Sequence, residues 1–170
     1  MNKKELLAAY LKEMQAEATA TRKCLERISE STYAFKPHPK SMEMGYLVLL
    51  VAEIPLWITH TIEKGEIDFA TFKHAQPKNT KEILDHFEQN LQSAVEAMNN
   101  ATDDQLNREF VLKANGQKLF SAAVMDSIGS TLNHWVHHRG QLTVYMRLNE
   151  IAVPSIYGPS ADEKQYTDHL

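Results

Sequence analysis

Four long segments of this sequence place apolar residues at steps of three and four, the spacing of one face of an α-helix. The first covers about residues 3–28, and similar patterns cover about residues 41–64, 79–98 and 121–149. The chain has only six glycines and six prolines, and most fall in or near the joining segments, which favours helices over a many-stranded sheet. We therefore expect a single all-α domain, residues 1–170, folded as an antiparallel-type four-helix bundle.

Local signals mark where these helices end and what lies between them. Gly65 stands where a C-terminal glycine cap is expected. Asn79 followed by Glu82 is typical of a capped helix start. Asn115-Gly116 predicts a tight hairpin, a short excursion before the last helix. We expect irregular structure in residues 29–41, 66–78, 99–107 and 151–170.

The second helical segment is apolar nearly all round. From Tyr46 to Ile58 only Glu53 carries a charge. Such a helix must be covered on more than one side, so it is either the central helix or part of a subunit contact. Its longest apolar run, residues 46–52, is too short to span a bilayer. We expect a cytoplasmic protein with no membrane partner, since residues 1–13 also lack the core of a signal peptide.

Charge and cysteine content exclude further classes of function. The formal net charge is −4. A negatively charged protein does not attract a polyanion, so we expect no nucleic-acid partner. Cys24 is the single cysteine and cannot form a disulfide within the chain. It falls beside the apolar stripe of the first helix, and we expect a buried, inert thiol.

The residues that carry a chemical signal are His134 and His138, four apart in the last helical segment. At this spacing they lie on one face, about 40° apart and about 6 Å along the axis. Two imidazoles so placed can bind one metal ion. A pair held only by structural hydrogen bonds is the alternative, and both stay open. Catalytic zinc sites take three protein ligands and a water, and nickel also suits imidazole.

No other histidine is well placed to complete such a site. His38 and His74 lie in predicted connectors and His169 lies in the tail. We place His86 on a solvated face of the third helix. Arg139, beside the pair, is expected at the surface or in an ion pair between helices.

The sequence resembles the DinB/YfiT-like family. The matching segments are Lys36–Met42, Ala52–Trp57, Leu132–Leu142 and Val153–Glu163, in the expected order along the chain. The His-His-Arg-Gly-Gln and Val-Pro-Ser-Ile-Tyr-Gly-Pro blocks within them are the most specific. The resemblance implies a four-helix bundle that is commonly a homodimer, with a divalent metal, often nickel or zinc, held by three histidines.

Two of those histidines match His134 and His138, and the third falls at Leu50. Leucine cannot bind a metal, so the site that the resemblance implies is incomplete here. Glu53, about one turn on, is a possible third ligand, and His60, ten residues on, is a more distant one. A weakened or absent metal site, with Leu50 beside the two histidines, is the outcome we expect.

Three functions remain open from the sequence. The resemblance implies a metal-dependent transferase using low-molecular-weight thiols, or a hydrolase, in which the metal lowers the pKa of a bound thiol or water. The second is a non-enzymatic, dimeric bundle that binds a small ligand without metal. The third is metal-free acid–base chemistry, with one histidine as the base and Gln141 or Tyr145 orienting the ligand.

Overall fold

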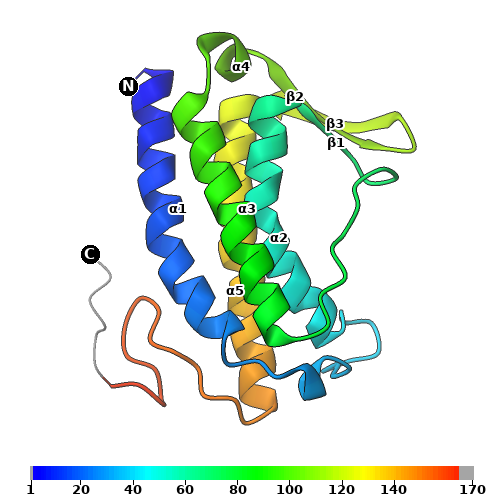
Figure 1. Cartoon of the computed structure of the whole chain (residues 1–170), viewed down its shortest axis with the longest axis vertical. Coiled ribbons are helices and arrows are strands. Elements are labelled where there is room, and N and C mark those ends of the chain that lie inside the picture. The colour runs from blue at the N-terminus through cyan, green and yellow to red at the C-terminus, as the bar shows by residue number, and fades with distance from the viewer. Residues whose placement is uncertain (1, 165–170) are drawn as a thin grey trace.

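The structure, a computed structural model, describes residues 2–164 (Figure 1). Most of the described chain is helical, as predicted. The predictions for residues 165–170, which include His169, lie outside the described residues. The elements in chain order are α1 (Lys3–Leu25), the short 3₁₀ helix η1 (Glu30–Thr32), α2 (Met44–Glu63), β1 (Glu66–Asp68), α3 (Thr80–Asn100), α4 (Asp103–Asn107), β2 (Glu109–Ala114), β3 (Gln117–Ala123) and α5 (Val124–Leu148).

The predicted caps and turn are confirmed by the backbone. The Asn79 side chain accepts a hydrogen bond from the backbone N–H of Glu82 at the start of α3. Gly65 follows α2 with a φ of 70°, a left-handed conformation that favours glycine. Asn115 and Gly116 also have positive φ, 51° and 75°, as a two-residue hairpin turn requires.

The four long helices α1, α2, α3 and α5 lie side by side, with α2 and α3 running in the same direction (Figure 1). The connection from α2 to α3 therefore returns along the length of the molecule. Hydrogen bonds fix how α2 lies against α5. Trp135 Nε1 donates to the carbonyl oxygen of Val51 at 2.9 Å, and Tyr145 Oη donates to that of Met42 at 3.1 Å. The two helices are thus antiparallel.

A three-stranded sheet, in the order β1-β2-β3, lies at the end of the bundle where α2 ends and α5 begins (Figure 1). The hairpin of β2 and β3 was predicted, but the all-α assignment is incomplete because β1 pairs in parallel with β2. Residues 66–68 were expected in a loop, since three residues carry no readable strand pattern. Asp68 holds this strand to the hairpin by accepting the backbone N–H groups of Asn115 and Gly116.

The core lies around α2. By length and composition α2 could cross a membrane, but 72% of its most apolar 18-residue window is buried inside the protein. Leu47, Ile54, Ile58 and Ile62 are fully buried. Its apolar character therefore matches a central helix covered by its neighbours, one of the two placements that the sequence left open. Cys24 is also buried, as expected, and burial raises the pKa of its thiol to about 11.

Arg139 is only 2% exposed and forms the predicted ion pair between helices. Its Nη1 lies 2.5 Å from Oε2 of Glu17 on α1, and its Nη2 donates to Tyr157 Oη at 2.8 Å. Tyr157 Oη in turn donates to Glu17 Oε1 at 2.8 Å. This network ties residues 151–164 to α1 and α5.

Replacing Arg139 with methionine should lower the free energy of unfolding by about 3–5 kcal/mol, because it leaves the Glu17 carboxylate buried without its cation. Urea unfolding measures this. The double variant R139M/E17M should recover much of the loss, since no buried charge remains. Arg147→Met is the matched control, because its pair with Asp162 lies at the surface and its loss should be much smaller. Equal losses in R139M and R147M would contradict a buried ion pair between Arg139 and Glu17.

Candidate functional site

The predicted pair, His134 and His138, lies on α5 with its rings in direct contact. The two Nε2 atoms are 2.7 Å apart, and the ring centroids are 4.4 Å apart. His138 Nδ1 lies 2.7 Å from Gln141 Oε1. Two turns of α5 therefore present a hydrogen-bonded chain of three side chains. Tyr145, the other residue considered for orienting a ligand, instead donates to Met42.

The polarity of this chain follows from what each atom can do. An amide oxygen only accepts, so His138 Nδ1 carries the hydrogen that faces Gln141. In a neutral imidazole the other nitrogen is then an acceptor, so His134 Nε2–H donates to His138 Nε2. Nδ1 of His134 is left with a lone pair. The two rings thus satisfy each other's hydrogen bond without a metal ion, and one nitrogen, His134 Nδ1, keeps a free lone pair.

The surroundings of the pair favour the neutral form of both rings. Burial lowers the pKa of His134 to about 4, with His138 and His137 contributing in the same direction. Burial also lowers the pKa of His138, against an opposing effect of Gln141. The indole of Trp57 covers His134, with ring centroids 5.3 Å apart. Water is thereby kept from one side of the imidazole.

The donor set does not fit a three-ligand metal centre. Two imidazole nitrogens on one zinc ion stand about 3.0–3.4 Å apart, given zinc–nitrogen bonds of about 2.1 Å, so the hydrogen-bonded pair would have to open. The bonds from Trp135 to Val51 and from Tyr145 to Met42 place Leu50 at the level of the turn that joins His134 to His138. Leu50 is 7% exposed. Among the described residues no group of three His, Cys, Asp or Glu side chains could hold a metal.

Glu53, the possible third ligand, is engaged elsewhere. Its carboxylate is 1% exposed and accepts from His74 Nδ1 at 2.6 Å and from the backbone N–H of Ala75 at 2.8 Å. His86 Nε2 lies 3.4 Å away, so the placement of His86 on a solvated face was wrong. These partners lower the pKa of Glu53 although burial alone would raise it. Glu53 therefore fastens the connection between α2 and α3.

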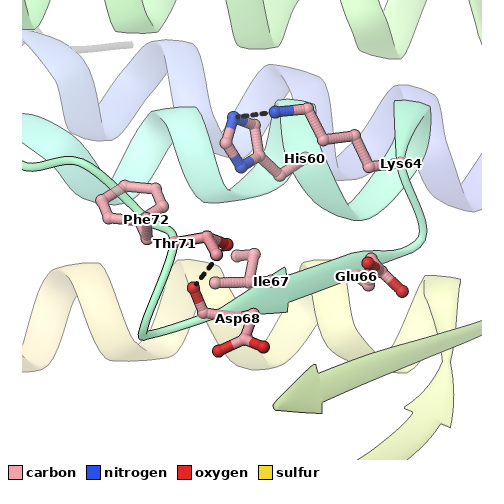
Figure 2. A pocket seen from close by; sticks show the side chains of 7 residues that line it. All are labelled: His60, Lys64, Glu66, Ile67, Asp68, Thr71 and Phe72. Atoms are coloured by element: carbon pink, nitrogen blue, oxygen red, sulfur yellow. Dashed lines mark hydrogen bonds between the residues drawn. The ribbon is translucent and has the colours of Figure 1, made fainter. Parts of the chain in front are cut away.

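His60, the more distant of the two possible third ligands, lines a different cavity. This cavity, of about 320 Å³, lies between the end of α2 and β1 (Figure 2). His60 Nε2 is 3.1 Å from Nζ of Lys64, and burial and this ammonium group lower its pKa. Phe72 also lines this cavity, and the centroid of its ring lies 5.6 Å from that of the His60 ring. His60 is thus not brought to the pair on α5.

A second cavity, of about 280 Å³, opens beside His134. It is lined by residues of α2, α5 and the sheet and by Phe69, just after β1, and most of its lining is apolar. The lining residues are Trp57, Thr61, Ile67, Phe69, Phe110, Leu112, Phe120, Ser127, Ser130, Thr131 and His134. Of these residues, only His134 was predicted from the sequence as a site residue. The signal that was available is the spacing of Ser127, Ser130, Thr131 and His134, which share one helical face.

The lowered pKa of His134 predicts how stability depends on pH. An unfolded histidine has a pKa near 6.5, so between about pH 6.5 and pH 4 the unfolded chain binds more protons than the folded chain. The free energy of unfolding should then fall as the pH decreases through this window. Urea unfolding at several pH values measures it, and NMR titration of the His134 ring should show a midpoint near 4.

His134→Gln should flatten this dependence, and Asn133→Gln, on the exposed neighbouring position of α5, should leave it unchanged. A His134 midpoint near 6.5 would contradict the buried environment described above.

Comparisons with known proteins agree with this architecture. A sequence model of the DinB family matches residues 1–169. The chain is 26% identical over 162 residues to the uncharacterized protein YrdA of Bacillus subtilis (strain 168), which covers 94% of this chain and 92% of YrdA. It is 27% identical over 128 residues to the uncharacterized protein YjoA of the same organism, covering 75% of this chain and 80% of YjoA.

Two crystal structures are similar in fold. The DinB-like protein YjoA of Bacillus subtilis has a TM-score of 0.66 at 18% identity, covering 92% of this chain and 99% of that one. A DinB-like protein from Bacillus cereus ATCC 10987 has a TM-score of 0.66 at 22% identity, covering 87% and 95%. At these identities the likeness shows the fold. Because the family model matches nearly the whole sequence, the chain belongs to the DinB family.

Proposed function

We propose that this protein binds a small organic molecule in the cavity beside His134, and that it does so without a protein-bound metal. The observation that carries the proposal is the 2.7 Å contact between the Nε2 atoms of His134 and His138. The resemblance adds that Leu50 stands where it implies the third histidine. Two neutral imidazoles that satisfy each other need no cation. Leu50 supplies hydrocarbon where the family pattern has a nitrogen donor.

The hydrogen-bonded chain has a defined part in this proposal. Gln141 orients His138, and His138 orients His134 by accepting the Nε2–H of His134. His134 then offers its Nδ1 lone pair as a hydrogen-bond acceptor for a bound molecule. The metal-free acid–base chemistry left open by the sequence is less favoured, because burial lowers the pKa of His134 to about 4 and so makes this nitrogen a weak base at neutral pH.

The alternative is the metal-dependent thiol transfer or hydrolysis that the family resemblance implies, with nickel or zinc. One observation favours it, namely that both Nε2 atoms already face each other on one side of α5. It requires a third donor that the described residues do not bring to the pair.

Assembly and location belong to the same proposal. We propose a homodimer in the cytoplasm. Val144 and Leu148 are exposed one turn apart on α5, and a second copy of the chain could cover them.

Metal content tests the proposal directly. Protein purified without an affinity tag should hold far less than one nickel or zinc ion per chain by elemental analysis. Leu50→His should create tight binding of one ion, because it restores the third imidazole at the level of the pair. This gain should disappear in L50H/H138A.

Leu49→His is the matched control, since it adds a histidine about 100° round the same helix and should not create the site. Stoichiometric metal in the natural protein, lost in His138→Ala, would overturn the proposal in favour of the metal-dependent alternative. No gain in L50H would contradict the placement of Leu50 beside the pair.

A further inference from the structure

The cavity beside His134 has one apolar wall, formed by a face of the sheet. Ile67 on β1 pairs with Leu112 on β2, and Leu112 pairs with Phe120 on β3. Because paired residues point to the same face, these three side chains form a row across the sheet. Phe110, two residues before Leu112, points to that face as well. All four line the cavity.

The opposite wall is polar and comes from α5. Ser127, Ser130, Thr131 and His134 follow the spacing i, i+3, i+4 and i+7, which places them on one side of the helix. All four line the cavity. A molecule between these walls meets hydrocarbon on one side, and hydroxyls and an imidazole on the other.

No full charge lines either wall. Among the described residues, the lining includes no lysine, arginine, aspartate or glutamate. A charged ligand would lose its hydration here without gaining a counter-charge, which is strongly unfavourable. The cavity therefore selects for uncharged molecules.

Two polar atoms on the lining residues have no partner within the described protein. Ser127 Oγ and Trp57 Nε1 are both buried and make no hydrogen bond. Thr131 Oγ1, by contrast, already donates to the carbonyl oxygen of Ser127 at 2.8 Å. Buried polar atoms are rarely left unpaired. The Ser127 hydroxyl is therefore an available partner for a polar group of a molecule in the cavity.

The mouth of the cavity carries aromatic rings that remain partly in solvent. Phe69 is 49% exposed and Phe120 is 55% exposed. Rings of this kind bury more surface when an aromatic molecule lies against them.

The volume of the cavity also limits the size of the ligand. A cavity of about 150 Å³ accommodates benzene, and this cavity measures about 280 Å³.

We propose that the ligand is an uncharged compound about the size of one substituted aromatic ring, bearing a hydroxyl or carbonyl group that faces Ser127 and His134. This inference rests on the proposed function, since it names the class of molecule that the same site takes. The ring lies against Leu112 and Phe120, and its polar group lies against α5.

Three probes of similar size test the inference. They are 1-phenylethanol, isopropylbenzene (the same shape with a methyl group in place of the hydroxyl) and benzoate, which is an anion. Calorimetry gives the affinities. The indole N–H signals in ¹H–¹⁵N NMR spectra give the location, because Trp57 lines the cavity whereas Trp135 is bonded to Val51 and does not line it.

We expect 1-phenylethanol to bind at least as tightly as isopropylbenzene and to shift the Trp57 signal alone, and we expect benzoate not to bind. A purely apolar cavity would give the opposite order for the first two, because burying an unpaired hydroxyl is unfavourable. Ser127→Ala should weaken 1-phenylethanol binding about three- to tenfold and leave isopropylbenzene binding unchanged.

Phe120→Ala should weaken both ligands. Leu119→Ala is its matched control, since Leu119 is 58% exposed on the same strand and does not line the cavity. Tighter binding of isopropylbenzene or of benzoate, or failure of all three probes, would overturn the ligand class. Failure of the metal-free proposal is a separate result, because elemental analysis of the natural protein decides it.

Discussion

The whole arrangement depends on covering α2, which carries apolar side chains on almost every side. Leu47, Ile54, Ile58 and Ile62 are fully buried, and each such side chain contributes about 1.5–3 kcal/mol when it leaves water. Neighbours must therefore surround this helix. Helices α3 and α5 flank it, and β1 follows directly from its C-terminal end (Figure 1). Helices cover most of α2, and the sheet lies near its C-terminal end. The cavity beside His134 lies between these two parts, because its lining comes from α2, α5 and the sheet.

Burial of α2 has a consequence for Glu53, the single charged residue in its apolar stretch. A buried carboxylate needs hydrogen-bond donors, and His74 and Ala75 supply them from the connection between α2 and α3. The same connection carries Phe72, whose ring lies 6.2 Å from that of Trp57, and Trp57 covers His134. Glu53 thus acts on the site indirectly. It holds the segment that packs against the tryptophan above the histidine pair.

Local features of the sequence were sufficient for the four long helices and the hairpin, because periodicity, caps and Asn115-Gly116 each act within a few residues. The short helix α4 was expected to be irregular, although a capping box of Thr102 and Gln105 begins it. β1 could not be predicted, since its pairing partner lies more than forty residues away. The His134–His138 pair was predictable from spacing on one helix. The cavity was not, because its walls come from α2, α5 and three strands. For Glu53, an isolated charge in an apolar run was a sign of buried partners, but nothing local identified His74.

On the proposed function, the decisive residue of the site is on α2 and not on α5. His134 and His138 have the same spacing whether or not they bind a metal, so their presence alone does not separate the two cases. Leu50 does, because it removes one donor and places hydrocarbon at the level of the pair. The imidazoles then satisfy each other, and burial keeps them neutral. A neutral acceptor beside an uncharged cavity is suited to a polar group on an apolar molecule. A metal ion at the same place would draw anions. On this proposal, Leu50 in place of the histidine that the resemblance implies changes the class of molecule that the site accepts, with no change on α5.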